Sequence, residues 1–235
     1  TGLVELVVSV LQAQQAADAL LASTLELSDL QFIEALQVPP GQGVPVAVTC
    51  GQSTVNKTLE VALYSEDASA PNLIAAAVHS DAVAPSVNVT QLEQRMQIQR
   101  PTDGRFLDQH FMHFGPRWSC IDRIVTNPEQ TEALLHLSLS AQLTNDLARH
   151  SLHPALFDMA NGAAQFLIPG FLPESEFYVP YRYDLLRVYA PLEASEIVDK
   201  QAYQREGFLD IAAVRVLQRS PVVVEIDLYE AVEPD

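Results

Sequence analysis

One carboxylate, that of Asp158, lies in the middle of a long apolar segment of the sequence. The segment spans residues 152–168, and its side chains are apolar on nearly every face of a helix, which predicts a buried helix. Pro154 suits the first helical position because its missing N–H would have no partner there, and Pro169-Gly170 ends the pattern. A buried charge is costly unless it is paired, hydrogen-bonded or protonated, so Asp158 requires an explanation.

Two explanations fit the position of Asp158. It is either a structural carboxylate, bonded to the backbone or to a neighbour such as Asn161, or an acid that burial keeps protonated for donation to a substrate. Structural networks and active sites both place carboxylates in apolar surroundings, so position alone leaves both explanations open.

Composition excludes several classes of partner. The chain has 235 residues, of which 48% are apolar, and this is enough for one large or two small globular domains. Its formal net charge of −17 argues against binding to nucleic acid or to an anionic membrane surface. The sequence contains no apolar run long enough to span a bilayer and no basic N-terminal leader, so we expect a cytoplasmic protein.

The cysteines and histidines do not predict a metal site. Cys50 and Cys120 are too few for a disulfide framework, and we expect each to be a small buried hydrophobe. His110 and His113 have a spacing that permits metal binding, but no third ligand is apparent. His153 precedes Pro154 and is expected to start the helix that contains Asp158.

The same order of elements occurs twice along the chain. An apolar helix is predicted from Thr1 to about Ala22, and strand-like alternation follows between Thr24 and His79. Residues 80–104 are rich in Ser, Asn, Gln, Arg and Pro and are predicted to link two units, with a short helix at 105–114. Further strands are predicted at 118–125, 132–143, 178–189, 197–203, 208–217 and 222–229.

A helix that is apolar on all sides has to be wrapped, and a curved antiparallel sheet achieves this. We therefore predict an α+β fold with two long buried central helices, each wrapped by a curved antiparallel β-sheet. The first unit is expected at residues 1–98 and the second at residues 99–235.

The segment His153-Pro154-Ala155-Leu156-Phe157-Asp158 resembles the second catalytic motif of dehydratase domains of modular polyketide synthases. Phe114-Gly115-Pro116-Arg117-Trp118 resembles the Tyr-Gly-Pro motif of that family, with Phe114 at the tyrosine position. The segment 1–7 resembles the start of the family's first central helix, and Tyr178-Val179-Pro180 resembles the strand after the second helix. The resemblance follows the chain in order, and the family fold is a double hotdog.

The resemblance implies loss of water from a 3-hydroxyacyl group on acyl carrier protein, which gives a 2-enoyl thioester. It implies that Asp158 is the acid that protonates the leaving hydroxyl, while a histidine of the first hotdog is the base. It further implies acyl carrier protein and neighbouring synthase domains as partners, a homodimer, and no cofactor beyond the carrier's phosphopantetheine arm. The substrate-binding residues that we predict are Phe114, Gly115, Pro116, Gly162 and Gln165.

The sequence departs from the family pattern at two places. The family's base lies in a His-x-x-x-Gly-x-x-x-x-Pro motif, but none of the six histidines has glycine four residues later. We therefore expect the base to be absent from these residues, either because its segment is missing or because the domain is inactive. Many family members have Gln or His at the position of Gly162, and Gln165, on the same helix face as Asp158, is predicted to replace that partner in part.

Three functions follow from these observations. The leading prediction is a dehydratase. An enoyl isomerase or pyran-forming cyclase of the same fold is the second, because it would use the same acid and base. The third is a non-catalytic structural or docking domain that retains Asp158 by descent.

Overall fold

The computed structural model describes residues 2–17, 24–53, 58–66, 68–100, 102, 114–162, 165, 167–168, 170–172, 175–176, 178–205, 208–217 and 222–232. The first half contains α1 (Gly2–Ala17), β1 (Thr24–Phe32), β2 (Val46–Gln52), β3 (Leu59–Ser65) and β4 (Leu73–Ser80). The remainder contains α2 (Val89–Arg95), β5 (Ile98–Arg100), η1 (Pro116–Trp118), β6 (Ile121–Thr126), β7 (Glu132–Ser138), η2 (Thr144–Ala148), α3 (Pro154–Gly162), β8 (Val179–Val188), β9 (Ser195–Arg205), β10 (Phe208–Leu217) and β11 (Val222–Val232). The helix predicted at 105–114 lies outside the described residues, apart from Phe114.

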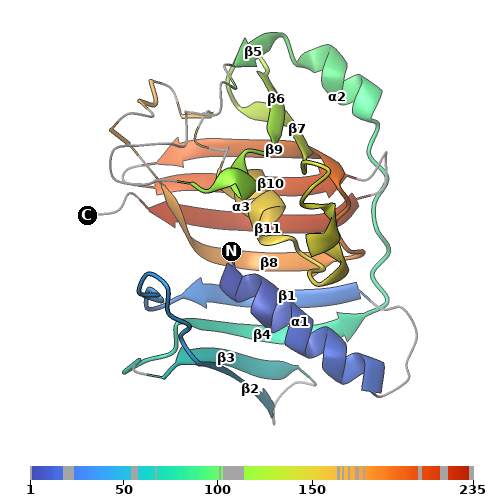
Figure 1. Ribbon diagram of the computed structural model, residues 1–235. Helices are drawn as coiled ribbons and strands as arrows, with labels where there is room; N and C mark the ends of the chain where they lie inside the picture. The colour runs from blue at the N-terminus through green and yellow to red at the C-terminus, as the bar shows by residue number, and fades with distance from the viewer. Residues whose placement is uncertain are drawn as a thin grey trace.

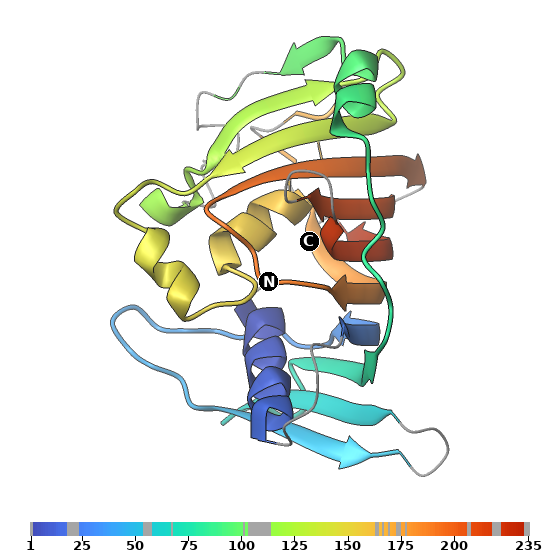
Figure 2. The same cartoon turned by 90° about the vertical axis from the view of Figure 1, so that its right-hand side faces the viewer.

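The described strands form one continuous 11-stranded antiparallel sheet in the order β2-β3-β4-β1-β8-β11-β10-β9-β7-β6-β5 (Figure 1). Pairing between β1 and β8 joins the strands of the first half to those of the second, with Leu27 opposite Leu186. Helix α1 lies against the β1–β4 part of the sheet and α3 against the β7–β11 part (Figures 1 and 2). This is the double hotdog that we predicted, with one central helix in each half.

Helix α1 buries one stripe rather than its whole surface. Val4, Val7, Val8 and Leu11 follow the spacing of one helix face, and each is at most 1% exposed. Leu6, on the opposite face, is 40% exposed. The sheet thus buries the apolar stripe of this central helix, as predicted, while the face that carries Leu6 is left partly exposed.

Helix α3 is shorter than the sequence predicted, because it ends at Gly162 and not near Ile168. The N–H of Ile168 donates to the carbonyl of Gln165 at 3.0 Å, a bond that spans three residues and is too tight for an α-helix. Leu167 and Ile168 are nevertheless only 3% and 4% exposed. The apolar character of this segment thus indicates that its side chains are buried, but not that its backbone is helical.

The predicted linker at 80–104 contains two regular elements, α2 and β5. The side chain of Asn88 caps α2 by accepting a hydrogen bond from the N–H of Gln91 at 3.1 Å. Leu92 and Met96 then pack against Leu134 in a second, smaller apolar cluster. The segment predicted to link the two units therefore contains regular structure that the sequence analysis did not predict. Several strands were predicted closely, and β10 has the predicted bounds.

Among the described residues, no helix is long and apolar enough to cross a membrane. Cys50 and Cys120 are both free thiols, and Cys120 is buried as predicted, whereas Cys50 is only partly buried.

Leu27 provides a test of the joined sheet, because it is fully buried in β1, which pairs with both β4 and β8. We expect Leu27→Ala to lower the free energy of unfolding by about 2–5 kcal/mol through lost burial and the cavity left behind. Urea denaturation at pH 7 measures this change. Leu6→Ala is the matched control and should cost less than about 0.5 kcal/mol because Leu6 is exposed. Equal effects at the two positions would contradict the assignment of the core.

A second test concerns Glu196, a carboxylate of β9 that is 1% exposed. Its Oε1 accepts a hydrogen bond from the N–H of Glu193 at 2.5 Å, while its Oε2 has no partner among the described residues. Burial raises the pKa of Glu196 to about 7, against an ordinary value of 4.5. Between these values the folded chain holds a proton that the unfolded chain has lost, so the ionised form costs stability as the pH rises through this window.

We therefore expect Glu196→Gln to stabilise the protein at pH 8.5 by about 1–3 kcal/mol and to have little effect at pH 4.5. Urea denaturation of both proteins at the two pH values measures the difference. A stability gain that is the same at both pH values would show that ionisation of Glu196 is not its cause.

Candidate active site

Asp158 lies near the start of α3, between the buried residues Phe157 and Met159, and is itself partly exposed. Its Oδ2 accepts a hydrogen bond of 2.8 Å from the indole Nε1–H of Trp118. Trp118 is the last residue of η1, and this short helix packs directly against α3. The carboxylate is therefore held at the junction of η1 and α3, with part of its surface open, rather than sealed inside the core.

The Phe114-Gly115-Pro116 segment positions the indole of Trp118. Gly115 precedes η1 and Pro116 takes its first position, and the N–H of Trp118 donates to the carbonyl of Gly115 at 3.0 Å. The ring of Phe114 lies 6.3 Å from that of Trp118, and both pack against the core. The structure thus brings the segment resembling the Tyr-Gly-Pro motif beside the helix that contains Asp158.

A small ion-pair network lies at the start of α3. Arg117 donates from Nε to Asp146 Oδ2 at 2.9 Å, and this hydrogen bond holds the pKa of Asp146 below its ordinary value. Nε2 of His153 lies 3.9 Å from the same oxygen. His153 is 2% exposed, and burial lowers its pKa, so its imidazole is neutral at pH 7.

His153 caps α3, because its Nδ1 accepts from the N–H of Leu156 at 3.5 Å, one of the helix donors without an internal partner. The predicted role of His153 as a helix-start residue is therefore confirmed. The nearby Asn161 donates from its side chain to the carbonyl of Phe157 at 2.7 Å.

Gly162 and Gln165 lie at the other end of α3. Gly162 is the last helical residue, and a Cβ placed on it would meet no atom within 4 Å, so open space is available there. The amide of Gln165 donates to the Gly162 carbonyl at 3.1 Å, and its oxygen accepts from the N–H of Tyr178 at 3.1 Å. The prediction that Gln165 replaces a partner of Asp158 is wrong, because the backbone around β8 already uses this amide.

Two polar residues of this region were not predicted from the sequence. We did not predict that Trp118 bonds Asp158, although a partly buried indole N–H usually has a partner and so gave a weak signal. Glu5, on α1, contacts the loop before α3, and nothing local in the sequence indicated this contact.

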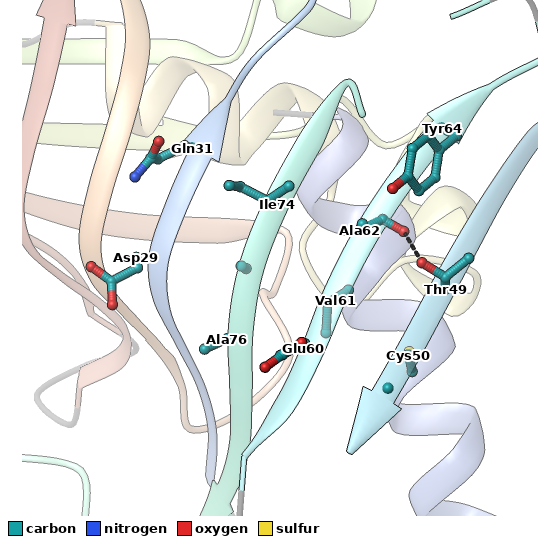
Figure 3. A pocket seen from close by; sticks show the side chains of 12 residues that line it. Asp29, Gln31, Thr49, Cys50, Glu60, Val61, Ala62, Tyr64, Ile74 and Ala76 are labelled. Atoms are coloured by element: carbon teal, nitrogen blue, oxygen red, sulfur yellow. Dashed lines mark hydrogen bonds between the residues drawn. The ribbon is translucent and has the colours of Figure 1, made fainter. Parts of the chain in front are cut away.

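No group of three or more residues suited to hold a metal ion occurs in the part of the chain that the structure describes. His110 and His113 lie outside that part. A separate groove runs over the opposite face of the first half from α1, lined by residues such as Thr49, Ala62 and Ile74 (Figure 3). Asp158 is not among its lining residues.

The family model described as polyketide synthase dehydratase N-terminal domain matches residues 80–230, from β4 into β11. The chain therefore belongs to the polyketide synthase dehydratase family, hydro-lyases that act on 3-hydroxyacyl intermediates. Its function is accordingly dehydration within a polyketide synthase, and the isomerase, cyclase and structural alternatives are not favoured. No curated protein matches the sequence.

Solved structures of such domains share the fold. The dehydratase domain from the CurF module of curacin polyketide synthase is 13% identical, with a TM-score of 0.82 over 97% of this chain and 82% of that one. The dehydratase domain of RzxB from Pseudomonas fluorescens is 13% identical, with a TM-score of 0.79 over 97% of this chain and 83% of that one.

The dehydratase domain from the CurK module of the curacin synthase is 16% identical, with a TM-score of 0.72 over 94% of this chain and 78% of that one. Solved structures of that domain include two variants described as inactive, one with a histidine changed to phenylalanine and one with an aspartate changed to asparagine. At these identities the likeness establishes the fold of this chain.

The bond between Trp118 and Asp158 can be measured by a double-mutant cycle. We expect Trp118→Phe and Asp158→Ala to be coupled by about 1–2 kcal/mol in the free energy of unfolding, because the indole N–H donates to the carboxylate. Tyr64→Phe combined with Asp158→Ala is the control, since Tyr64 lies on β3 in the other half and should be additive. Additivity for the Trp118 pair as well would contradict the hydrogen bond.

Proposed function

We propose that Asp158 is the general acid in the dehydration of a 3-hydroxyacyl thioester on acyl carrier protein. The observation that supports this role is the unequal environment of its two oxygens. Oδ2 accepts from the Trp118 indole at 2.8 Å, whereas Oδ1 accepts no hydrogen bond among the described residues. One oxygen therefore orients the group, and the other is available to hold a proton and donate it.

The reaction needs such a donor. Hydroxide is a poor leaving group, so the 3-hydroxyl has to be protonated as its bond to carbon breaks, while a base removes a proton from the carbon next to the thioester carbonyl. N–H groups at the start of a central helix are suited to stabilise the enolate that forms. A water molecule leaves, and the 2-enoyl thioester remains on the carrier.

The proposal assigns the acid and not the base to this chain. None of the six histidines of the sequence has the spacing of the family's histidine motif. The inactive CurK variants affect one histidine and one aspartate, which is consistent with a pair of such groups in that domain.

The proposal extends to substrate contacts and partners. Phe114, Gly115 and Pro116 lie beside the Trp118–Asp158 pair, and Gly162 leaves open space at the end of the same helix. We propose that these four residues contact the acyl chain or its phosphopantetheine arm. Gln165 is buried and bonded to the backbone, so it would support the site from behind.

The proposed partners are acyl carrier protein, neighbouring synthase domains and a second copy of the chain, in the cytoplasm. The family to which the chain belongs supports the first two of these partners. The proposed chemistry uses no cofactor beyond the carrier's phosphopantetheine arm.

Asp158→Asn tests the assignment. The amide preserves shape but cannot release a proton, so we expect the rate of water loss to fall by about 10²- to 10⁴-fold or more. The measurement is mass spectrometry of a 3-hydroxyacyl carrier protein incubated with the full-length protein, in which loss of one water marks turnover.

Asp184→Asn is the matched control, because Asp184 is a partly exposed carboxylate of β8 that pairs with Arg182. This variant should turn over at the wild-type rate. Near-normal water loss by a folded Asp158→Asn protein would exclude Asp158 as the acid.

A further inference from the structure

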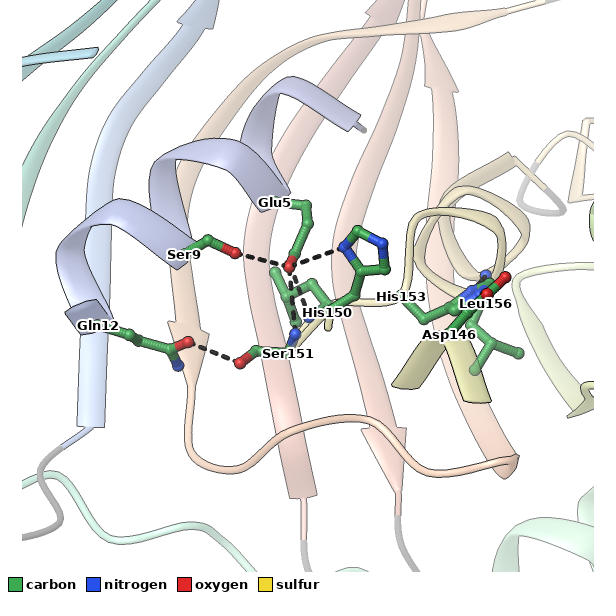
Figure 4. Close-up of polar contacts among 9 residues, drawn as sticks. Glu5, Ser9, Gln12, Asp146, His150, Ser151, His153 and Leu156 are labelled. Carbon is green, nitrogen blue, oxygen red and sulfur yellow. Dashed lines mark hydrogen bonds and ion pairs between the residues drawn. The ribbon is translucent and has the colours of Figure 1, made fainter. Parts of the chain in front are cut away.

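The other central helix also has a single carboxylate, and its environment differs from that of Asp158. Glu5 of α1 is 2% exposed. Its Oε2 accepts from the N–H of Leu152 at 2.7 Å, and its Oε1 accepts from the N–H of Ser151 at 3.1 Å and from the hydroxyl of Ser9 at 2.9 Å (Figure 4). Nδ1 of His150 lies 3.5 Å from the same Oε1.

These contacts join parts of the chain that are far apart in sequence. Ser151 is 146 residues from Glu5, and it makes two more bonds that fix the same loop. Its hydroxyl donates to Gln12 Oε1 at 2.6 Å, also on α1, and its carbonyl accepts from the N–H of Leu192 at 2.8 Å. The loop 150–152 is thus held by α1 from one side and by the segment after β8 from the other.

The position of Glu5 requires a side chain with two acceptor oxygens. The N–H groups of Ser151 and Leu152 are donors, and a buried N–H without a partner is costly. Burial raises the pKa of Glu5, and the donors around it oppose that shift. A glutamine here would direct its NH₂ group at one of these donors. A side chain of the same shape with only one acceptor oxygen therefore cannot replace the carboxylate.

The loop leads directly into the active helix. Residue 152 is followed by His153, which caps α3, and by Pro154, which starts it. A displacement of the loop would therefore move the start of α3 and with it Asp158, four residues further along. The distance between Asp158 and the indole of Trp118 depends on the same placement.

We propose that Glu5 is a positioning residue that fixes the 150–152 loop and thereby sets Asp158 against Trp118. Glu5 does not itself act as an acid, because donors occupy both of its oxygens. The catalytic part of this proposal rests on the proposed function of Asp158, whereas the structural part can be measured without turnover.

The test uses the indole N–H of Trp118 as a reporter in the full-length protein. Its ¹H–¹⁵N resonance is assigned by its loss in Trp118→Phe. We expect Glu5→Gln to shift this resonance in the folded protein. We also expect it to speed hydrogen exchange by at least about tenfold at whichever of the Ser151 and Leu152 amides faces the NH₂ group, because that amide loses its acceptor. We also expect kcat to fall about tenfold with little change in KM, because the acid is misplaced and substrate binding is not.

Ser9→Ala is the matched control, because it removes one hydroxyl from Oε1 and leaves both loop contacts in place. It should leave the indole resonance and kcat unchanged. If Glu5→Gln does not fold, Glu5→Asp provides the test: it keeps the charge but shortens the reach, and a smaller shift in the same resonance is expected.

An unchanged indole resonance together with an unchanged kcat in a folded Glu5 variant would overturn the proposal. This outcome is distinct from failure of the proposed function. If Asp158→Asn retains turnover, Asp158 is not the acid, whereas the indole and exchange measurements still decide whether Glu5 positions α3.

Discussion

The structure depends on the pairing of β1 with β8, because this contact allows one antiparallel sheet to cover two apolar helices. Both α1 and α3 have too little polar surface to be exposed to water on all sides, and each half of the sheet buries one of them. Joining the halves also brings the start of α1 beside the loop that leads into α3 (Figure 2). The polar contact between Glu5 and the loop before α3 therefore lies at the junction between the two halves.

Apolar packing at this junction leaves backbone donors that have to be satisfied. The side chains of Glu5 and His153 accept from N–H groups that precede or begin α3. The backbone N–H of Trp118 donates to the carbonyl of Gly115 within η1, and its indole N–H donates to Asp158. These side chains thus provide hydrogen-bond partners for groups that would otherwise be unpaired. Together, the contacts fix the position of Asp158.

Much of this arrangement was predictable from the sequence, and the failures have physical causes. The period of two in β2 and β3 marked those strands, and the apolar pattern of residues 152–168 placed Asp158 on a helix. Apolarity could not locate the end of α3, because Leu167 and Ile168 are as buried in a turn as they would be in a helix. The Trp118–Asp158 and Glu5–Ser151 contacts span 40 and 146 residues, and such pairs leave no local pattern.

The two central helices place their carboxylates in opposite chemical situations. Glu5 has donors on both oxygens, so adding a proton would weaken the hydrogen bonds that it accepts from the backbone. Asp158 has one oxygen bonded to the indole of Trp118 and, within the described chain, one oxygen that no donor contacts. A dehydratase needs a helix that is held in place and an acid that can transfer a proton. One carboxylate is poorly suited to both roles. In the proposed division, Glu5 on α1 holds the start of α3, while Asp158 on α3 supplies the proton.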